Sequence, residues 1–99
     1  MFVALTRARP LRRDAVALRA VHGSTSEPPR VAYAVGKHVG GSVERNRVRR
    51  RLREAVRECA SELTPGSAYL VTGSRAVMTR PFTELSAALR ELARDAGRR

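Results

Sequence analysis

The sequence is poor in residues on which several protein classes depend. It has one cysteine, Cys59, among 99 residues, no tryptophan and only 4% aromatic residues. A single cysteine cannot close an internal disulfide, which excludes a secreted scaffold held together by disulfides. His22 and His38 lie far from Cys59 and at no zinc-ligand spacing, so the sequence predicts no metal site.

Long hydrophobic runs are also missing. No apolar stretch approaches the roughly 20 residues of a membrane span. Residues 1–10 contain arginines where a signal peptide needs a long apolar segment. We therefore expect a cytoplasmic protein with no membrane contact. The 42% of hydrophobic residues suit one small globular domain spanning residues 1–99.

Acidic residues are scarce, and the basic excess is concentrated. Twenty basic residues face nine acidic ones, which gives a net charge of +11, and Lys37 is the only lysine. Residues 45–57 hold seven arginines against Glu54 alone, so more than half of the net charge lies in this window. A charge of this sign and size predicts a polyanionic partner, above all a nucleic acid.

Hydrophobic spacing predicts three strands and two helices. The strands are expected at 15–21, 31–35 and 68–72, the first two as an antiparallel hairpin and the third, apolar on both sides, in the centre. The helices are expected at 43–63 and from Phe82 to Ala96. Within 31–35, Tyr33 shares a face with Val31 and Val35. This β-β-α-β-α order is typical of a small α+β sandwich.

The helix at 43–63 has three faces at about 100° per residue. An apolar face must pack on the sheet, and a second face mixes Arg47 and Arg51 with Glu54 and Glu58, which can neutralise one another. The third face carries no carboxylate, and it consists of Asn46, Arg50, Arg53 and Arg57, with Arg49 at its border. Because guanidinium groups match phosphate in two-point contacts, this face predicts a phosphate-backbone site.

No catalytic constellation is visible in the chain. Gly36, Gly40 and Gly41 lack the spacing of a phosphate-binding loop and are read as turn glycines. Glu54 and Glu58 are read as pairing partners of neighbouring arginines rather than as acid–base catalysts. Cys59 falls on the apolar face as a core thiol.

The segment VGKHVGGSVERNRVRRRLREA, residues 35–55, resembles the signature of the protein subunit of bacterial ribonuclease P. That resemblance implies a two-layer α/β sandwich with a mixed sheet of about four strands and a left-handed β-α-β crossover. It also implies an auxiliary subunit that binds the catalytic RNA and the single-stranded 5′ leader of precursor tRNA. The RNA would perform the hydrolysis with Mg²⁺, in a one-to-one complex with the protein.

Site residues follow from the same resemblance. The RNA-binding set comprises Lys37, Arg45, Asn46, Arg47, Arg49, Arg50 and Arg53, and the basic stripe adds Arg57. Residues 1–13 resemble the last turn of a truncated N-terminal helix and a basic link. The expected leader cleft is lined by Phe2, Leu5 and Tyr33. Three positions depart from the family pattern, namely Gly36, His38 and Gly41.

Two other functions fit the residues less closely. A general basic RNA- or DNA-binding protein, such as a ribosome-associated factor, would share the charge but would not distinguish precursor from mature tRNA. A nuclease acting without RNA would cleave by itself in the presence of metal.

Overall fold

The computed structural model describes residues 8–23 and 25–98. The strands are β1 (Leu11–Arg13), β2 (Val16–Val21), β3 (Arg30–Ala34) and β4 (Ala68–Gly73), and the long helices are α2 (Ser42–Glu58) and α3 (Phe82–Gly97). Three short 3-10 helices complete the set, η1 (Lys37–Val39), η2 (Ala60–Glu62) and η3 (Arg75–Met78). Expectations that fall on residues 1–7 lie outside the described residues.

One mixed sheet carries all four strands in the order β1-β2-β4-β3. β2 is antiparallel to both β1 and β4, whereas β3 runs parallel to β4. The expected hairpin between the second and third of these strands is therefore wrong, because β4 lies between them. β4 takes this central place because its side chains are apolar on both faces, as the sequence predicted.

Strand β1 lies in the segment that was expected to form a basic link. A two-residue turn at Asp14 and Ala15 joins β1 to β2, and it pairs Arg13 with Val16. Asp14 adopts a positive φ of 52°, which aspartate tolerates better than most residues. β1 escaped prediction because three residues, two of them arginine, show no apolar alternation.

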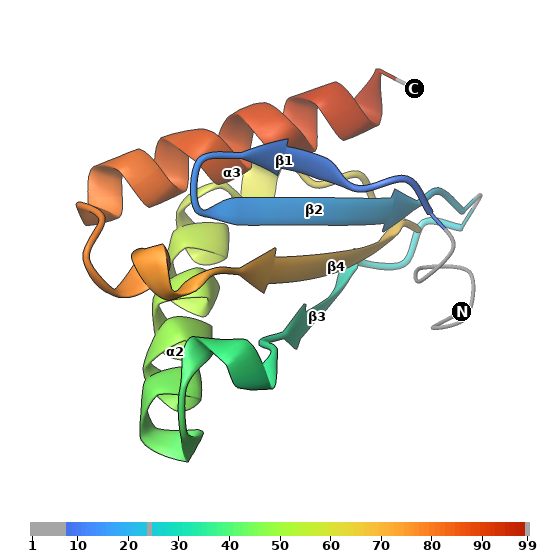
Figure 1. Ribbon diagram of the computed structural model, residues 1–99. Helices are drawn as coiled ribbons and strands as arrows, with labels where there is room; N and C mark the ends of the chain where they lie inside the picture. The colour runs from blue at the N-terminus through green and yellow to red at the C-terminus, as the bar shows by residue number, and fades with distance from the viewer. Residues whose placement is uncertain (1–7, 24, 99) are drawn as a thin grey trace.

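The chain between β3 and β4 crosses one face of the sheet through α2. Since β3 and β4 are parallel neighbours, this is a β-α-β unit, and Figure 1 shows that it is left-handed. Most such crossovers are right-handed, so the handedness follows the family resemblance and not the general rule. α2 ends at Glu58, and η2 continues the chain, so the single helix expected to residue 63 is divided at Cys59.

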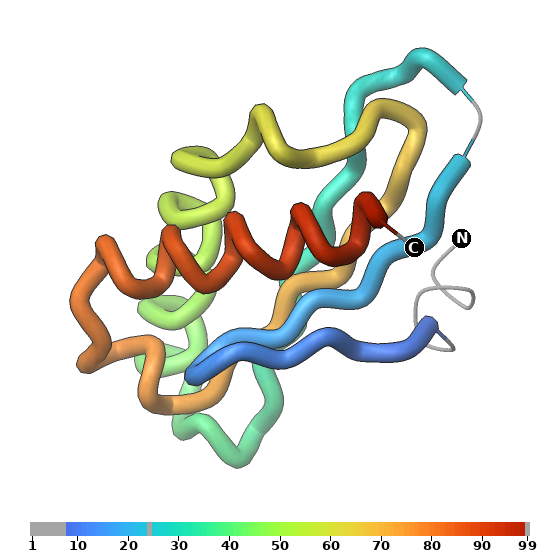
Figure 2. The backbone as a smooth tube through the Cα atoms, turned by 90° about the horizontal axis from the view of Figure 1, so that it is seen from above, coloured from blue at the N-terminus to red at the C-terminus, as the bar shows by residue number. Residues whose placement is uncertain are grey.

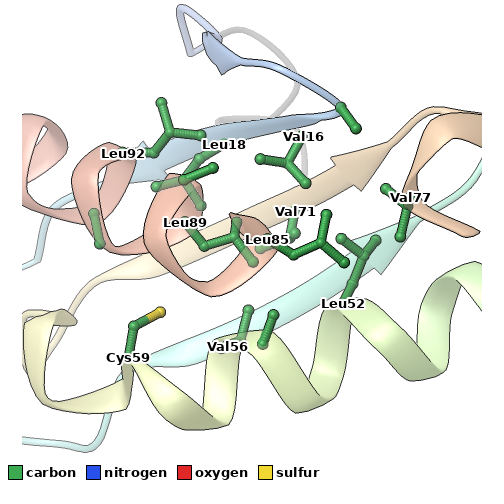
Figure 3. Close-up of a cluster of buried hydrophobic side chains, with 14 of the residues drawn as sticks. Val16, Leu18, Leu52, Val56, Cys59, Val71, Val77, Leu85, Leu89 and Leu92 are labelled. Carbon is green, nitrogen blue, oxygen red and sulfur yellow. The ribbon is translucent and has the colours of Figure 1, made fainter. Parts of the chain in front are cut away.

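Both long helices lie on the same face of the sheet, with α3 over β1 and β2 and α2 behind β3 and β4 (Figures 1 and 2). The main core fills the space between the sheet and this helical layer, with Leu18, Val71, Leu52 and Leu89 at its centre (Figure 3). No helix or strand of the described residues covers the opposite face. That open face carries a small apolar cluster of Ala68 and Leu70 with Val21, Ala32 and Ala34.

Candidate nucleic-acid interface

Helix α2 displays a basic surface that has no carboxylate partners. Val48, Leu52, Ala55 and Val56 are buried, which fixes the rotation of the helix and turns the arginines outward. None of the ion pairs formed by the described residues includes a side chain of α2. The exposed cations of α2 are Arg47, Arg50, Arg53 and Arg57, and they remain available for phosphate.

The expected neutralisation of Arg51 by Glu54 or Glu58 is wrong. The Arg51 guanidinium turns toward the segment before α3 and donates to the carbonyl oxygen of Arg80. Its Nε is buried without a hydrogen-bond partner. Arg51 therefore holds α2 against the η3–α3 corner, while Arg47, which the helical wheel placed on the same face, stays exposed.

Short-range hydrogen bonds order the first turns of α2. The Arg49 Nη1 donates to Asn46 Oδ1 at 3.0 Å, and the Arg45 Nε donates to the Gly41 carbonyl oxygen at 3.4 Å. The Asn46 oxygen thus accepts one hydrogen bond within the helix. The Arg-Asn-Arg segment in the first turns of α2 is therefore rich in hydrogen-bond donors.

Lys37 extends the basic surface into η1, immediately before α2. It is exposed, and Arg75 from η3 fastens the same turn by donating to the Val39 carbonyl oxygen at 3.4 Å. A Cβ atom at Gly36 would lie 2.6 Å from the His38 ring, so the observed ring position requires glycine there. The two departures from the family pattern at Gly36 and His38 are therefore linked by this close approach.

A groove of about 470 Å³ opens on the uncovered face of the sheet, at the end where η1 lies. Alanines and glycines form much of its floor, and cationic or polar side chains stand at its edges. Its lining includes Arg12, Asp14, Ala17, Arg19, Ala34, Gly36, His38 and Thr72. Because Gly36 and His38 flank Lys37, the groove and the basic surface of α2 meet at η1.

The one carboxylate in the groove lining is already neutralised. Asp14 accepts from Arg80 Nε at 3.0 Å through Oδ2 and at 3.3 Å through Oδ1. This hydrogen bond raises the pKa of Arg80, because it stabilises the charged guanidinium group. The Arg80 carbonyl oxygen also accepts a hydrogen bond from Arg51, so Arg80 connects the edge of the groove to α2.

The predicted α2 residues and Lys37 lie on adjoining elements, α2 and η1, whereas Tyr33 lies outside the groove. Tyr33 does not line the groove, because it faces the helical layer, where Arg53 lies over its ring at 5.5 Å from the centroid. Phe2 and Leu5 are outside the described residues. Sequence reasoning missed Arg12, Arg19 and Arg75. Alternation along β2 was the only signal for Arg19, and Arg12 lies in β1, which shows no apolar alternation.

Other kinds of site find no support in residues 8–23 and 25–98. This part of the chain contains no group of three His, Cys, Asp or Glu side chains that could hold a metal ion. None of its helices is long and apolar enough to cross a membrane.

A mixed sheet with one open face, a groove on that face and an arginine-rich helix that forms no ion pair among the described residues are the features of a small α+β protein that binds nucleic acid. The family model described as Ribonuclease P matches residues 2–97. The chain belongs to this family. The resemblance based on residues 35–55 is thereby confirmed.

Sequence relatives agree with this membership. The ribonuclease P protein component of Symbiobacterium thermophilum is 35% identical over 89 residues, covering 90% of this chain and 77% of that protein. The protein of the same name from Beutenbergia cavernae is 48% identical over 54 residues, which is 52% of this chain and 45% of that protein.

Solved structures show the same fold. The ribonuclease P protein of Thermotoga maritima matches with a TM-score of 0.80 at 16% identity, covering 95% of this chain and 89% of that one. The Staphylococcus aureus protein matches with a TM-score of 0.74 at 16% identity, with 96% and 87% covered. The mixed four-stranded α+β fold is thus shared at low sequence identity.

Proposed function

We propose that this chain is the protein subunit of a ribonuclease P ribonucleoprotein and that α2 binds its catalytic RNA. The observation that carries this proposal is the surface of α2, where exposed arginines stand in series without any carboxylate partner. Arginine forms bidentate contacts with phosphate, and each contact gains from the release of condensed counterions. Lys37 and the donors at the start of α2 extend this RNA-binding surface.

The groove on the open face is the proposed site for the single-stranded 5′ leader of precursor tRNA. Its alanine-rich floor lets a nucleotide approach the sheet closely, and Arg12 stands exposed at its edge for a leader phosphate. Pairing with Arg80 prevents Asp14 from repelling that phosphate. Phe2 and Leu5 remain the residues expected to complete this site.

Hydrolysis is assigned to the RNA subunit with its Mg²⁺ ions. The described residues offer no cluster of metal ligands, and the Asp14 carboxylate is occupied by Arg80. The role that fits them is to bind and to orient, in a one-to-one complex with the RNA in the cytoplasm. Neutralising closely packed phosphates lowers the Mg²⁺ concentration that an active RNA requires.

Reconstitution with the cognate RNA tests this function. Addition of the protein is expected to increase 5′ cleavage of precursor tRNA most strongly at low Mg²⁺, and to favour precursor over mature tRNA in binding. Unchanged cleavage across Mg²⁺ and salt titrations would refute the assignment. Equal binding of precursor and mature tRNA would instead support a general basic RNA-binding protein, and cleavage by the protein with metal alone would indicate an independent nuclease.

A further inference from the structure

The two tyrosines of the chain have different environments. Tyr69 is completely buried, and its hydroxyl oxygen accepts a hydrogen bond from the Thr64 N–H at 2.8 Å. Tyr33 is partly exposed, and its hydroxyl has no hydrogen-bond partner among the described residues. Tyr69 therefore has the contacts of a core residue, whereas Tyr33 is only partly buried and its hydroxyl is unpaired among the described residues.

The position of Tyr33 places this ring beside the basic surface of α2. β3 is an edge strand, so no neighbouring strand covers its outer side. The Arg53 Cζ lies 5.5 Å from the centre of the ring, within the usual range of a cation–π contact. Arg50 and Arg57 are three and four residues from Arg53 and are exposed on the same side of α2. A partly exposed aromatic ring thus lies next to a row of exposed cations.

We infer that Tyr33 and Arg53 form a stacking site for one unpaired nucleobase of the RNA bound along α2. Every nucleobase has a π face that can stack on an aromatic ring or on a guanidinium group, and the flanking arginines can bind the phosphates on either side of that base. The site lies on the helical side of the sheet, away from the groove proposed for the leader. The identity of the RNA rests on the proposed function.

The chemistry of Tyr33 suits a polyanionic ligand. Burial raises the pKa of its hydroxyl above the usual value, a larger effect than the opposing influence of Arg53. The side chain therefore stays neutral at physiological pH and does not repel phosphate. Contact with Arg53 also restricts that long side chain before RNA binds, which reduces the entropy lost on binding.

Three variants test the stacking site by direct binding to a transcript of the catalytic RNA. Tyr33→Leu keeps apolar bulk against the core but removes the ring, and it should weaken binding by about tenfold, the effect of losing one stacked base. Because no charge is lost, the dependence of log K on log salt should keep its slope. Tyr33→Phe should bind within about twofold of the original protein. Val31→Ala, on the same face of β3, controls for loosening of the strand.

The alternatives give different results. Original affinity in Tyr33→Leu, or an equal loss in Val31→Ala at a matched decrease in Tm, would overturn the inference. Selective loss of leader-dependent binding would also overturn it, because it would place Tyr33 in the leader site.

A second measurement does not depend on the catalytic RNA. The original protein should bind a ten-residue oligoadenylate more tightly than an abasic strand of equal charge, and Tyr33→Leu should reduce that preference. An unchanged preference would overturn the stacking site even if cleavage were stimulated. Failure to stimulate cleavage, with a preference that depends on Tyr33, would refute the proposed function and leave the stacking site supported.

Discussion

Helices α2 and α3 have similar buried faces and different exposed ones. They contain 17 and 16 residues and pack side by side on one face of the sheet. α2 buries Val48, Leu52 and Val56 there, and α3 contributes Leu85 and Leu89 among others. Their buried sides therefore provide the same kind of packing, and burial alone does not distinguish their roles.

The arginines of α3 and its C-cap are used within the protein. Arg94 Nη2 binds Glu62 Oε1 at 3.0 Å, and Arg98 Nη1 lies 3.5 Å from Asp95 Oδ1. Arg90 Nη2 donates to the Glu58 carbonyl oxygen at 3.1 Å. The contacts of Arg94 and Arg90 attach α3 to η2 and to the end of α2, whereas Arg50 and Arg57 of α2 make no such contact among the described residues.

The difference shows why the number of arginines does not by itself identify a binding surface. An arginine already paired with a carboxylate or a carbonyl must exchange that partner for phosphate, so the net gain is smaller. An unpaired arginine replaces only water and counterions. The partners of each guanidinium group therefore separate a binding helix from a structural one.

The largest expected effect comes from replacing three arginines of α2, compared with replacing three arginines of α3 and its C-cap. Arg50→Ala, Arg53→Ala and Arg57→Ala together should weaken binding of the catalytic RNA by about a thousandfold, roughly tenfold for each lost contact, two of them with phosphate and one with the stacked base. The slope of log K against log salt should become shallower by about two units. Filter binding between low and moderate salt measures both quantities.

The matched control is the triple replacement Arg90→Ala, Arg94→Ala and Arg98→Ala. It removes the same charge from the molecule, so a purely global charge effect would give the same loss of affinity. We expect a nearly unchanged salt slope and a lower Tm. Equal slopes for the two triple variants would show that total charge, and not the unpaired surface of α2, determines binding.

Local patterns predicted the elements of this fold better than their arrangement. Alternation along residues 31–35 correctly placed Tyr33 with Val31, and apolar spacing located α2 and α3 to within a few residues at their starts. The order of the strands depends on long-range pairing, so the insertion of β4 between β2 and β3 was beyond that reasoning. The handedness of the crossover came only from the family resemblance.

Prediction of the candidate site was likewise more successful within one helix than for contacts between distant parts of the chain. The helical wheel identified the exposed stripe of α2, because that surface depends on spacing within one helix. It could not foresee that Arg51 reaches Arg80, a residue 29 positions away. Nor could local patterns show which face of the sheet stays open. The family resemblance assigned Tyr33 to a leader cleft, and Tyr33 does not line the described groove.

Arg47 and Arg51 allow an exposed arginine and a hydrogen-bonded arginine to be compared within α2 itself. Arg47→Ala should make the salt slope shallower by about one unit with little change in stability, because Arg47 is exposed without an ion pair. Arg51→Ala should leave the slope unchanged and reduce the free energy of unfolding by about 1 kcal/mol, since its hydrogen bond to the Arg80 carbonyl is lost. Urea unfolding and RNA binding measured on both variants check this. The reverse pattern would exchange the two roles.

The smallest expected effect concerns the ion pairs of α3. The hydrogen bond from Arg94 lowers the pKa of Glu62, so the folded state favours the ionised carboxylate. This contribution is present above the pKa of the unfolded glutamate and is lost as the pH falls through the lower folded pKa.

Glu62→Gln should therefore lower Tm slightly at pH 7 but not at about pH 3, where the original protein has also lost the interaction. Glu58→Gln is the matched control, because Glu58 of α2 has no ion pair among the described residues, and it should lower Tm at pH 7 less than Glu62→Gln does. An equal decrease in Tm for Glu58→Gln would show that the acidic residues of α2 are paired in solution, and would remove the distinction between the two helices.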